Sequence, residues 1–263
     1  MARLPILMYH RISSDECPVP QRAADEKLYA ISLPEFTWQL DSMASMGLRG
    51  VSVGEACAAA RRKEGIPGNW VVLTFDDGNR SDAVHALPLL DKRGFSATFF
   101  VGASRIGIEG GLEEGMIVHL VSSGMEIGSH GMSHRFLPTL SEAEEAEECA
   151  RSRQILAEIT GREIHYFSLP GGRYKPRTIQ LLQRLGYRAA CSSNFGYNSS
   201  LQQFLLKRIP VHQGTSKQIF RAIMTRSIAK LLPGYGRAMT AALLRQLLGE
   251  KAYSKVRALR LRG

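Results

Sequence analysis

Cysteines are few in this sequence, and long apolar runs are missing. The four cysteines stand far apart with no CxxC pair, which argues against a zinc knuckle or a disulfide framework and predicts free thiols in a reducing compartment. No stretch reaches the roughly 18 apolar residues of a membrane span, and the apolar run before His10 is too short for the core of a signal peptide. We therefore expect a cytoplasmic protein.

Composition excludes disordered and collagen-like classes. Of 263 residues, 44% are hydrophobic and 22% charged, with 25 glycines and 11 prolines. Residues 1–216 hold 23 basic and 23 acidic side chains, whereas residues 217–263 hold 11 basic and one acidic, so the tail carries the whole net charge of +10. We expect a large N-terminal domain over residues 1–215 and a basic helical extension over residues 216–263.

The tail has the pattern of a basic amphipathic helix pair. Apolar residues such as Ile219, Ile223 and Leu231 alternate with basic ones, and Pro233 with Gly234 divides the segment in two. Two interpretations remain open: the helices contact an anionic membrane at its inner face, or they pack on the preceding domain with a solvated basic face. No aromatic-rich basic motif indicates a nucleic-acid partner.

Short β-branched and aromatic runs predict a parallel sheet. Buried strands are expected at Pro5–Tyr9, Val71–Phe75, Ala97–Val101, Glu126–Ser129, Tyr166–Leu169, Arg188–Ser192 and Arg208–Val211. Strands that alternate with helices favour parallel pairing through right-handed crossovers. Such an α/β chain closes into a (β/α) barrel or opens into a doubly wound sheet, and in both folds the functional site lies at the carboxyl ends of the strands.

Two capping boxes predict where helices begin. Ser32 with Glu35 opens one helix, and Ser141 with Glu144 opens another that runs to about Thr160. The second helix starts with five glutamates that suit the positive end of its dipole. They are Glu142, Glu144, Glu145, Glu147 and Glu148. We expect them to form a solvated face and not a metal site.

Polar side chains follow several of the expected strands. Asp76 and Asp77 come directly after one strand, and His130 and His134 follow another. His10 ends the first strand. Because parallel strands end at one edge, these carboxylates and imidazoles are expected to collect there. Charged groups at the end of an apolar strand are usually paired or bound to metal.

Two imidazoles and one carboxylate form a metal site with three protein ligands and open positions for water. A second, adjacent carboxylate suits a base that acts on that water. Gly131 stands where HExxH proteases have glutamate, so that class is excluded. Two histidines and one carboxylate also suit the iron(II) of an oxygenase, an alternative that the extra carboxylate disfavours.

Three motifs resemble those of the polysaccharide deacetylases, the NodB-homology enzymes of carbohydrate esterase family 4. Thr74–Gly78 (TFDDG) is similar to the first motif, Ser129–His134 (SHGMSH) to the second, and Phe167–Gly172 (FSLPGG) to a variant third. The resemblance spans about residues 4–212. It implies a distorted (β/α) barrel of NodB type that hydrolyses acetyl groups on sugars with the help of a metal ion.

The resemblance also implies residue roles. Asp76 is the implied catalytic base, and Asp77, His130 and His134 are the implied metal ligands. We expect Zn²⁺, with Co²⁺, Ni²⁺ or Mn²⁺ as alternatives. The implied reaction is N-deacetylation of a polysaccharide or lipid-linked glycan, in bacterial exopolysaccharide biosynthesis. Hydrolysis of another non-peptide amide, such as a formamide, stays open.

Leu7–His10 (LMYH) resembles the family's last motif, Leu-x-x-His, moved to the front of the chain. This order is similar to the branch that deacetylates poly-N-acetylglucosamine-type polymers, and by that match His10 is the general acid. A barrel closes its first strand against its last, so a residue can change termini and keep its place. His10 as a packed structural histidine, and His212 as the acid instead, remain open.

Some positions depart from the family pattern. Ser168 stands where many members have an arginine that orients the base, and Gly171 replaces the usual aromatic residue. Arg173 is the residue expected to compensate in part. Pro170, Gly171, Gly172 and Arg173 are expected to contact substrate. No segment matches the motif whose Asp and Trp brace the acid. Because the usual arginine is missing, a non-catalytic glycan-binding domain also stays open, although the intact metal ligands argue against it.

Overall fold

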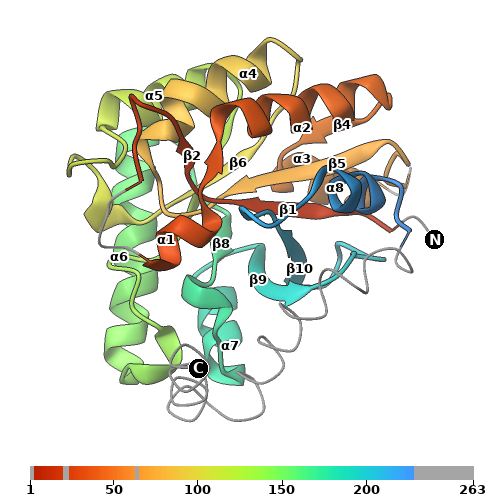
Figure 1. Cartoon of the computed structure of the whole chain (residues 1–263). Coiled ribbons are helices and arrows are strands. Elements are labelled where there is room, and N and C mark those ends of the chain that lie inside the picture. Colours follow the sequence, from red (N-terminus) through yellow and green to blue (C-terminus); the bar gives the residue numbers. More distant parts are fainter. Residues whose placement is uncertain (1–2, 20–23, 63–64, 228–263) are drawn as a thin grey trace, which may run out of the picture. The chain divides into compact units, whose positions relative to one another are not determined.

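The computed structural model describes residues 3–19, 24–62 and 65–227 (Figure 1). The chain divides into two units, Met1–Thr215 and Ser216–Gly263, which are described separately. The strands of the first unit are β1 (Ile6–Tyr9), β2 (Ile12–Ser13), β3 (Ile31–Ser32), β4 (Arg49–Val51), β5 (Trp70–Phe75), β6 (Thr98–Val101), β7 (Glu126–Ser129), β8 (Tyr166–Ser168), β9 (Ala189–Phe195) and β10 (Leu205–Pro210). Its α-helices are α1 (Ala24–Tyr29), α2 (Leu33–Ser45), α3 (Val53–Arg61), α4 (Leu87–Asp91), α5 (Glu114–Ser122), α6 (Glu142–Thr160) and α7 (Pro176–Arg184).

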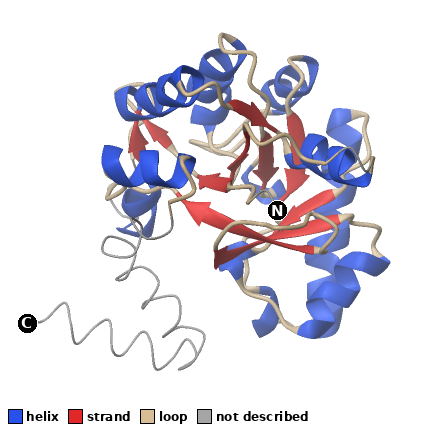
Figure 2. Cartoon of the chain, turned by 90° about the vertical axis from the view of Figure 1, so that its right-hand side faces the viewer, coloured by secondary structure: helices blue, strands red, loops and turns tan. Residues whose placement is uncertain are grey.

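Seven parallel strands close into a barrel. The order around the ring is β1-β10-β9-β8-β7-β6-β5, and the ring closes because β1 pairs with both β10 and β5. β4 pairs with the first half of β5, and β6 pairs with the end of β5. In Figure 2 the strands lie inside and helices surround them. The predicted (β/α) barrel is therefore confirmed, and the open doubly wound sheet is excluded.

The closure of the barrel places β1, from the start of the chain, between β10 and β5. Leu7 of β1 lies opposite Ile209 of β10 on one side and opposite Leu73 of β5 on the other. All residues of β1 and β5 are buried, because both faces of a barrel strand are covered, one by the interior and one by helices. A side chain that follows β1 therefore lies at the same end as those that follow β5 and β10.

The predicted helix starts are confirmed. The Ser32 hydroxyl accepts a hydrogen bond from the Glu35 N–H at 3.3 Å, and the capping box of Ser141 with Glu144 is present. α6 ends at Gly161, whose φ of 63° is the left-handed conformation that glycine adopts without strain. Both long helices thus begin where their local sequence directs, and α6 also ends there.

The expected solvated face of α6 is wrong for two of its glutamates. Glu145 and Glu148 are only 1% and 6% exposed. Glu145 accepts hydrogen bonds from Arg177 and Thr178 of α7, and Glu148 accepts hydrogen bonds from the loop that follows β7. The helical period turns these two positions, three residues apart, to the same buried face.

In the second unit, the structure describes Ser216–Ser227. α8 (Lys217–Met224) begins at Ser216, whose hydroxyl accepts a hydrogen bond from the Ile219 N–H at 3.3 Å. The rest of the expected amphipathic pair, from residue 228 on, lies outside the described residues. Among the helices that are described, none combines the length and the apolar character needed to cross a lipid bilayer.

Candidate active site

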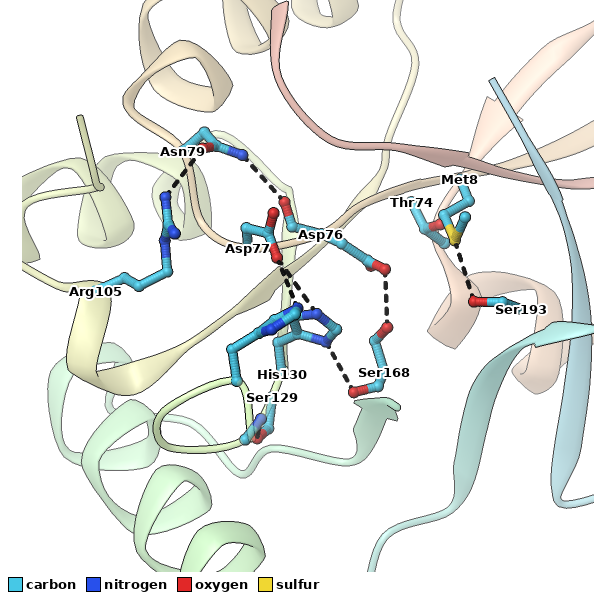
Figure 3. Close-up of polar contacts among 12 residues, drawn as sticks. Met8, Thr74, Asp76, Asp77, Asn79, Arg105, Ser129, His130, Ser168 and Ser193 are labelled. Carbon is cyan, nitrogen blue, oxygen red and sulfur yellow. Dashed lines mark hydrogen bonds and ion pairs between the residues drawn. The ribbon is translucent and has the colours of Figure 1, made fainter. Parts of the chain in front are cut away.

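The predicted site residues meet at the carboxyl end of the barrel. Asp76 and Asp77 directly follow β5. His130 directly follows β7, and His10 directly follows β1. Figure 3 shows that the two neighbouring aspartates point in different directions, Asp77 toward His130 and Asp76 toward Ser168. The two carboxylates therefore belong to separate parts of one site.

One carboxylate oxygen and two ring nitrogens come together from Asp77, His130 and His134. The three ligand atoms lie within 4.8 Å of one another. Asp77 Oδ1 is 3.4 Å from His130 Nε2 and 3.5 Å from His134 Nε2. Asp77 and His134 both have left-handed backbone conformations, with φ of 81° and 60°. Such angles are costly for residues other than glycine and occur where the surroundings impose them, often at functional sites.

A backbone carbonyl fixes the tautomer of His130. Its Nδ1 lies 2.8 Å from the Ser168 carbonyl oxygen. Because a carbonyl can only accept, Nδ1 carries a proton, and Nε2 is the ring nitrogen that faces Asp77. Metal-binding histidines are oriented in this way, with the second ring nitrogen bonded to a carbonyl or carboxylate.

The donor set fits a divalent cation. Asp77 Oδ1 is buried and has no hydrogen-bond partner among the described residues, although two ring nitrogens face it. Burial disfavours the charged carboxylate, but the imidazoles, His130 first, outweigh burial and hold the pKa of Asp77 below its usual range. The His134 side chain is 42% exposed, so the group opens to solvent. Asp77, His130 and His134 thus form a three-ligand arrangement with room for water or substrate.

Asp76 is held by a different set of partners. Two N–H groups of Arg208 donate to its two oxygens, each at 2.7 Å, and the Ser168 hydroxyl donates at 3.0 Å. Asp76 is 2% exposed, and burial opposes its ionisation. The Arg208 cation outweighs burial and holds the pKa of Asp76 below its usual range. The structure therefore keeps this carboxylate charged without a metal.

Arg208 is the functional residue that the sequence reasoning missed. It is fully buried in β10 and also donates to the Thr74 hydroxyl at 3.3 Å and to the Ser192 carbonyl at 3.0 Å. Arg208 makes two hydrogen bonds to Asp76, and the Arg173 guanidinium lies 4.0 Å from the ring centroid of Phe136. One signal was available, because an arginine within a buried strand requires an acidic partner.

His10 lies near both carboxylates. Its ring stacks on Tyr29, with centroids 4.5 Å apart and planes inclined by 28°. Its Nδ1 is buried and has no hydrogen-bond partner among the described residues. Burial lowers the pKa of His10, and the charges of Asp77 and Asp76 oppose that effect. A protonated His10 is therefore a stronger acid than an exposed histidine.

His212, the alternative acid, follows β10 at the same end of the barrel. The ring Nδ1 of His212 accepts a hydrogen bond from the Gly214 N–H at 3.0 Å, and the backbone N–H of His212 donates to the Thr215 hydroxyl at 3.1 Å. Burial lowers the pKa of this ring too. These contacts hold His212 in a turn of its own, whereas the charges of Asp76 and Asp77 act on His10.

The loop expected to bind substrate follows β8. Gly171 and Gly172 have φ of 61° and 69°, and a Cβ atom would lie 2.5 Å from the Phe136 ring at the first and 2.3 Å from Ser193 at the second. Pro170 is buried, while Gly171 is exposed. The loop therefore presents backbone at the rim, and the Phe136 ring lies beside the position where an aromatic residue was missing.

Comparison with known proteins agrees with this geometry. The family model of polysaccharide deacetylases matches residues 63–190. YxkH of Bacillus subtilis strain 168, whose name assigns it to the polysaccharide deacetylases, is 29% identical over 223 residues, which are 84% of this chain and 76% of that protein. The deacetylase PplD of Streptococcus pyogenes, solved in complex with acetate, is 27% identical with a TM-score of 0.76 over 84% of this chain and 98% of that chain. IcaB from Ammonifex degensii is 29% identical with a TM-score of 0.72 over 86% of this chain and 97% of that chain. The predicted resemblance is confirmed: this chain carries a polysaccharide deacetylase domain of the NodB-homology class.

Proposed function

We propose that this chain is a metal-dependent N-deacetylase, which hydrolyses acetamide groups of an N-acetylated polysaccharide or lipid-linked glycan and releases acetate. The observation that carries the proposal is that two adjacent carboxylates have different kinds of partner. Asp76 is bonded to Arg208, while Asp77 faces two imidazoles. Amide hydrolysis requires one group to accept a proton from water and another set to hold a metal ion.

Asp77, His130 and His134 are the proposed metal ligands. Zn²⁺ is the ion that we propose, because it takes mixed nitrogen and oxygen ligands in sites with three protein ligands, and Co²⁺, Ni²⁺ and Mn²⁺ accept similar donors. When bound, such an ion polarises the acetyl carbonyl and lowers the pKa of a water molecule. The chain's own contribution is to bring three ligand atoms within 4.8 Å of one another.

Asp76 is the proposed base that takes the proton from the attacking water. Arg208 and Ser168 supply three hydrogen bonds to its carboxylate. A carboxylate has about four acceptor positions, so one remains on Oδ1 for the water. Arg208 therefore keeps the base charged and also fixes the direction in which it accepts a proton.

His10 is the proposed acid that donates a proton to the leaving nitrogen. An amine leaves readily only when it is protonated as the C–N bond breaks. The nearby charges of Asp77 and Asp76 favour the protonated imidazole, and burial makes it give up the proton more readily. Stacking on Tyr29 restrains the ring. His212 is the alternative to be tested if His10 fails.

Pro170, Gly171, Gly172 and Arg173 are the proposed substrate contacts. Gly171 is exposed, and no side chain fits there beside Phe136. A backbone free of side chains allows a sugar to approach closely. An extended polymer such as a poly-N-acetylglucosamine-type bacterial exopolysaccharide is the substrate class that we propose for this open rim.

Acetate release tests the proposed reaction. The purified full chain is stripped of metal, reloaded with Zn²⁺ and incubated with N-acetylglucosamine oligomers, and acetate and free amines are quantified. We expect release that depends on Zn²⁺ and is abolished by Asp76→Asn. N-formylated sugars and simple amides measured in parallel identify an amidase of different specificity. Failure of the Zn²⁺-loaded chain to release acetate from any N-acetylated glycan would overturn the proposal.

We further propose that residues 216–263 form a separate basic extension that contacts an anionic membrane at the cytoplasmic face. Their excess of positive charge supports this, since each basic residue near anionic lipid contributes about 1 kcal/mol. Flotation of the full chain with vesicles of phosphatidylcholine and phosphatidylglycerol provides the test. Replacing Arg257, Arg260 and Arg262 by glutamine is expected to reduce recovery in the floating fraction, and equal recovery would contradict the proposal.

A further inference from the structure

A buried carboxylate from α6 closes the loop between the two histidines of the proposed metal site. Glu148 Oε2 accepts hydrogen bonds from the N–H groups of Met132 and Ser133, each at 2.9 Å, and Oε1 accepts one from the Ser133 hydroxyl. Glu148 is 6% exposed. All three donors lie in the segment between His130 and His134. One side chain thus accepts from the N–H groups of both Met132 and Ser133, while the Gly131 N–H donates to the Ser129 hydroxyl.

The carbonyl groups of the same loop are held by a different segment. The Gly131 carbonyl accepts a hydrogen bond from the Ala103 N–H at 3.1 Å, and the Met132 carbonyl accepts one from the Ser104 N–H at 2.8 Å. Ala103 and Ser104 belong to the turn that follows β6. The loop is therefore fixed between the end of β6 and α6, with Glu148 as its anchor on the α6 side.

The placement of His134 depends on this anchoring. His134 directly follows Ser133 and has a φ of 60°, a conformation that a histidine keeps only where the surrounding structure imposes it. Its side chain is 42% exposed, so burial does little to hold the ring. The His134 ring also lies against the His130 ring, with centroids 5.0 Å apart, so the 3.5 Å approach of His134 Nε2 to Asp77 depends on the backbone of the loop together with that contact.

We propose that Glu148 is a positioning residue for the metal site: it fixes the loop that aims His134 at Asp77, so the ligands are aligned before the cation binds. The proposal rests on the proposed function, because it assigns Glu148 to that same site. It predicts that loss of the carboxylate weakens metal binding in a protein that remains folded. A role confined to the packing of α6 would not change metal affinity.

Glu145 provides a matched control on the same helix. It is also buried, lies three residues earlier on α6, and accepts hydrogen bonds from Arg177 and Thr178. Those partners belong to α7 and not to the loop of His134. Methionine is similar in length to glutamate and has no carboxylate. Glu145→Met and Glu148→Met therefore each remove one buried carboxylate, and only Glu148→Met removes contacts to the loop.

Glu148→Gln is the conservative variant. Its amide oxygen still accepts from the N–H groups of Met132 and Ser133, and its NH₂ group donates to the Ser133 hydroxyl, which can also accept. Glutamine therefore retains every contact of the loop, without the charge. Ser133→Ala removes one contact and retains the two backbone ones.

The experiment measures the dissociation constant of Zn²⁺ by competition with a chromophoric chelator, on the full chain and each variant. Loss of an orienting partner outside the ligand set typically weakens metal binding by about 10–100-fold, and we expect that change for Glu148→Met. Changes within about three-fold are expected for Glu145→Met and Glu148→Gln, and an intermediate one for Ser133→Ala. The absorption spectrum of bound Co²⁺ is expected to change in Glu148→Met and not in Glu145→Met. Circular dichroism confirms the fold of each variant.

The outcomes separate this inference from the proposed function. If the unmodified chain binds no stoichiometric Zn²⁺, the metal site of the proposed function is wrong. If it binds Zn²⁺ and Glu148→Met binds equally well, or if both methionine variants weaken binding equally, Glu148 has no positioning role. If Glu148→Met does not fold, Ser133→Ala decides, and an unchanged affinity in that variant overturns the inference.

Discussion

The two adjacent aspartates of the site are held in opposite ways. Asp76 accepts three hydrogen bonds from Arg208 and Ser168, whereas Asp77 Oδ1 has no hydrogen-bond partner among the described residues and faces two ring nitrogens. A catalytic base must be kept charged and oriented by the protein's own side chains, because no bound metal ion holds it. A metal ligand must instead keep its lone pair available. Neighbours in sequence thus acquire different chemistry from their partners alone.

The backbone differs between the two positions as well. The Asp76 N–H donates to the Tyr9 carbonyl at 2.9 Å, which extends the pairing of β1 with β5. Asp77, one residue later, has already left the sheet, with a φ of 81°. The proposed base is therefore fixed by the barrel, and the proposed ligands are fixed by loops. Changes on the base side are expected to damage folding, and changes on the ligand side are expected to damage metal binding.

Arg208→Met is expected to have the largest effect, because it leaves Asp76 as a buried carboxylate without its cation. Breaking a buried ion pair by removing one partner costs about 3–5 kcal/mol, and urea denaturation is expected to show that loss at neutral pH. Asp76 has a lowered pKa in the folded protein, so the ion pair stabilises the fold above the usual carboxyl pKa and loses this effect as the pH falls through the lowered value.

Two comparisons sharpen this prediction. The loss caused by Arg208→Met should shrink in acid, because a protonated Asp76 no longer needs the cation. Arg208→Lys retains a charge without the paired geometry, and we expect a smaller loss of stability with a large loss of kcat. A loss of stability below about 1 kcal/mol in Arg208→Met, the range of exposed pairs, would contradict the view that the barrel depends on this pair.

His134→Ala is expected to abolish stoichiometric metal and to leave the fold nearly unchanged. Two protein ligands seldom hold Zn²⁺ well, so the third is required. The zinc content of purified protein, measured by inductively coupled plasma mass spectrometry, and the urea midpoint of the metal-free chain are the two readouts. His212→Ala is the control, because it removes a histidine from the same end of the barrel outside the proposed ligand set. Full zinc occupancy in His134→Ala would remove His134 from that set.

His10→Ala is expected to lower kcat for an N-acetyl amide by about 10²–10⁴-fold, the usual contribution of a general acid. Metal content should stay unchanged. An activated acetyl ester, whose leaving group needs no proton, should lose far less activity. Burial lowers the pKa of His10, so the alkaline limb of the amide profile should fall near or below the pH at which ordinary histidines titrate, and it should vanish in the variant.

Asp76→Asn is the matched comparison for His10→Ala. Activation of water serves both substrates, so this change should damage ester and amide hydrolysis alike. Equal loss of both activities in His10→Ala, with intact folding and metal content, would refute the role as acid. His212→Ala would then be the next variant to test with the same pair of substrates.

The location of the site, at the carboxyl ends of the strands, could be predicted from the sequence because the patterns that indicate it are local. Asp76 and Asp77 end a run of six buried strand residues, and His130 ends another strand. Parallel strands that end at one edge bring such residues together without any knowledge of side-chain contacts. The helix starts were local signals too: Ser32 and Ser141 both cap helices where predicted, and the reciprocal capping box forms at Ser141 with Glu144.

The contacts that hold the site could not be predicted, since they join distant segments. Arg208 meets Asp76 across 132 positions, and only closure of the barrel creates that pair. Glu148 lies among glutamates that look alike in sequence, and only the packing of α6 separates it from its exposed neighbours. β10 begins at Leu205, before the predicted start at Arg208, and β4, with three residues, was too short for its pattern to be recognised.

The smallest predicted effect concerns Glu126, at the opposite end of the barrel from the site. Glu126 begins β7 and accepts hydrogen bonds from the Gly54 N–H at 2.9 Å and from the Thr98 hydroxyl at 2.5 Å. Burial raises the pKa of Glu126 from 4.5 to about 7. Between these values the folded protein retains a proton that the unfolded chain releases, so stability falls as the pH rises through this window.

Glu126→Gln keeps an oxygen acceptor and does not titrate, so the variant should lose less stability than the unmodified chain between pH 4.5 and 7. We expect a difference on the order of 2 kcal/mol, measured by urea denaturation at both ends of the window. Glu147→Gln, an exposed change on α6, is the control and should track the unmodified chain. Parallel pH curves for the chain and Glu126→Gln would show that Glu126 is charged in the folded barrel, and polar strand ends would then be tolerated away from the site as well as within it.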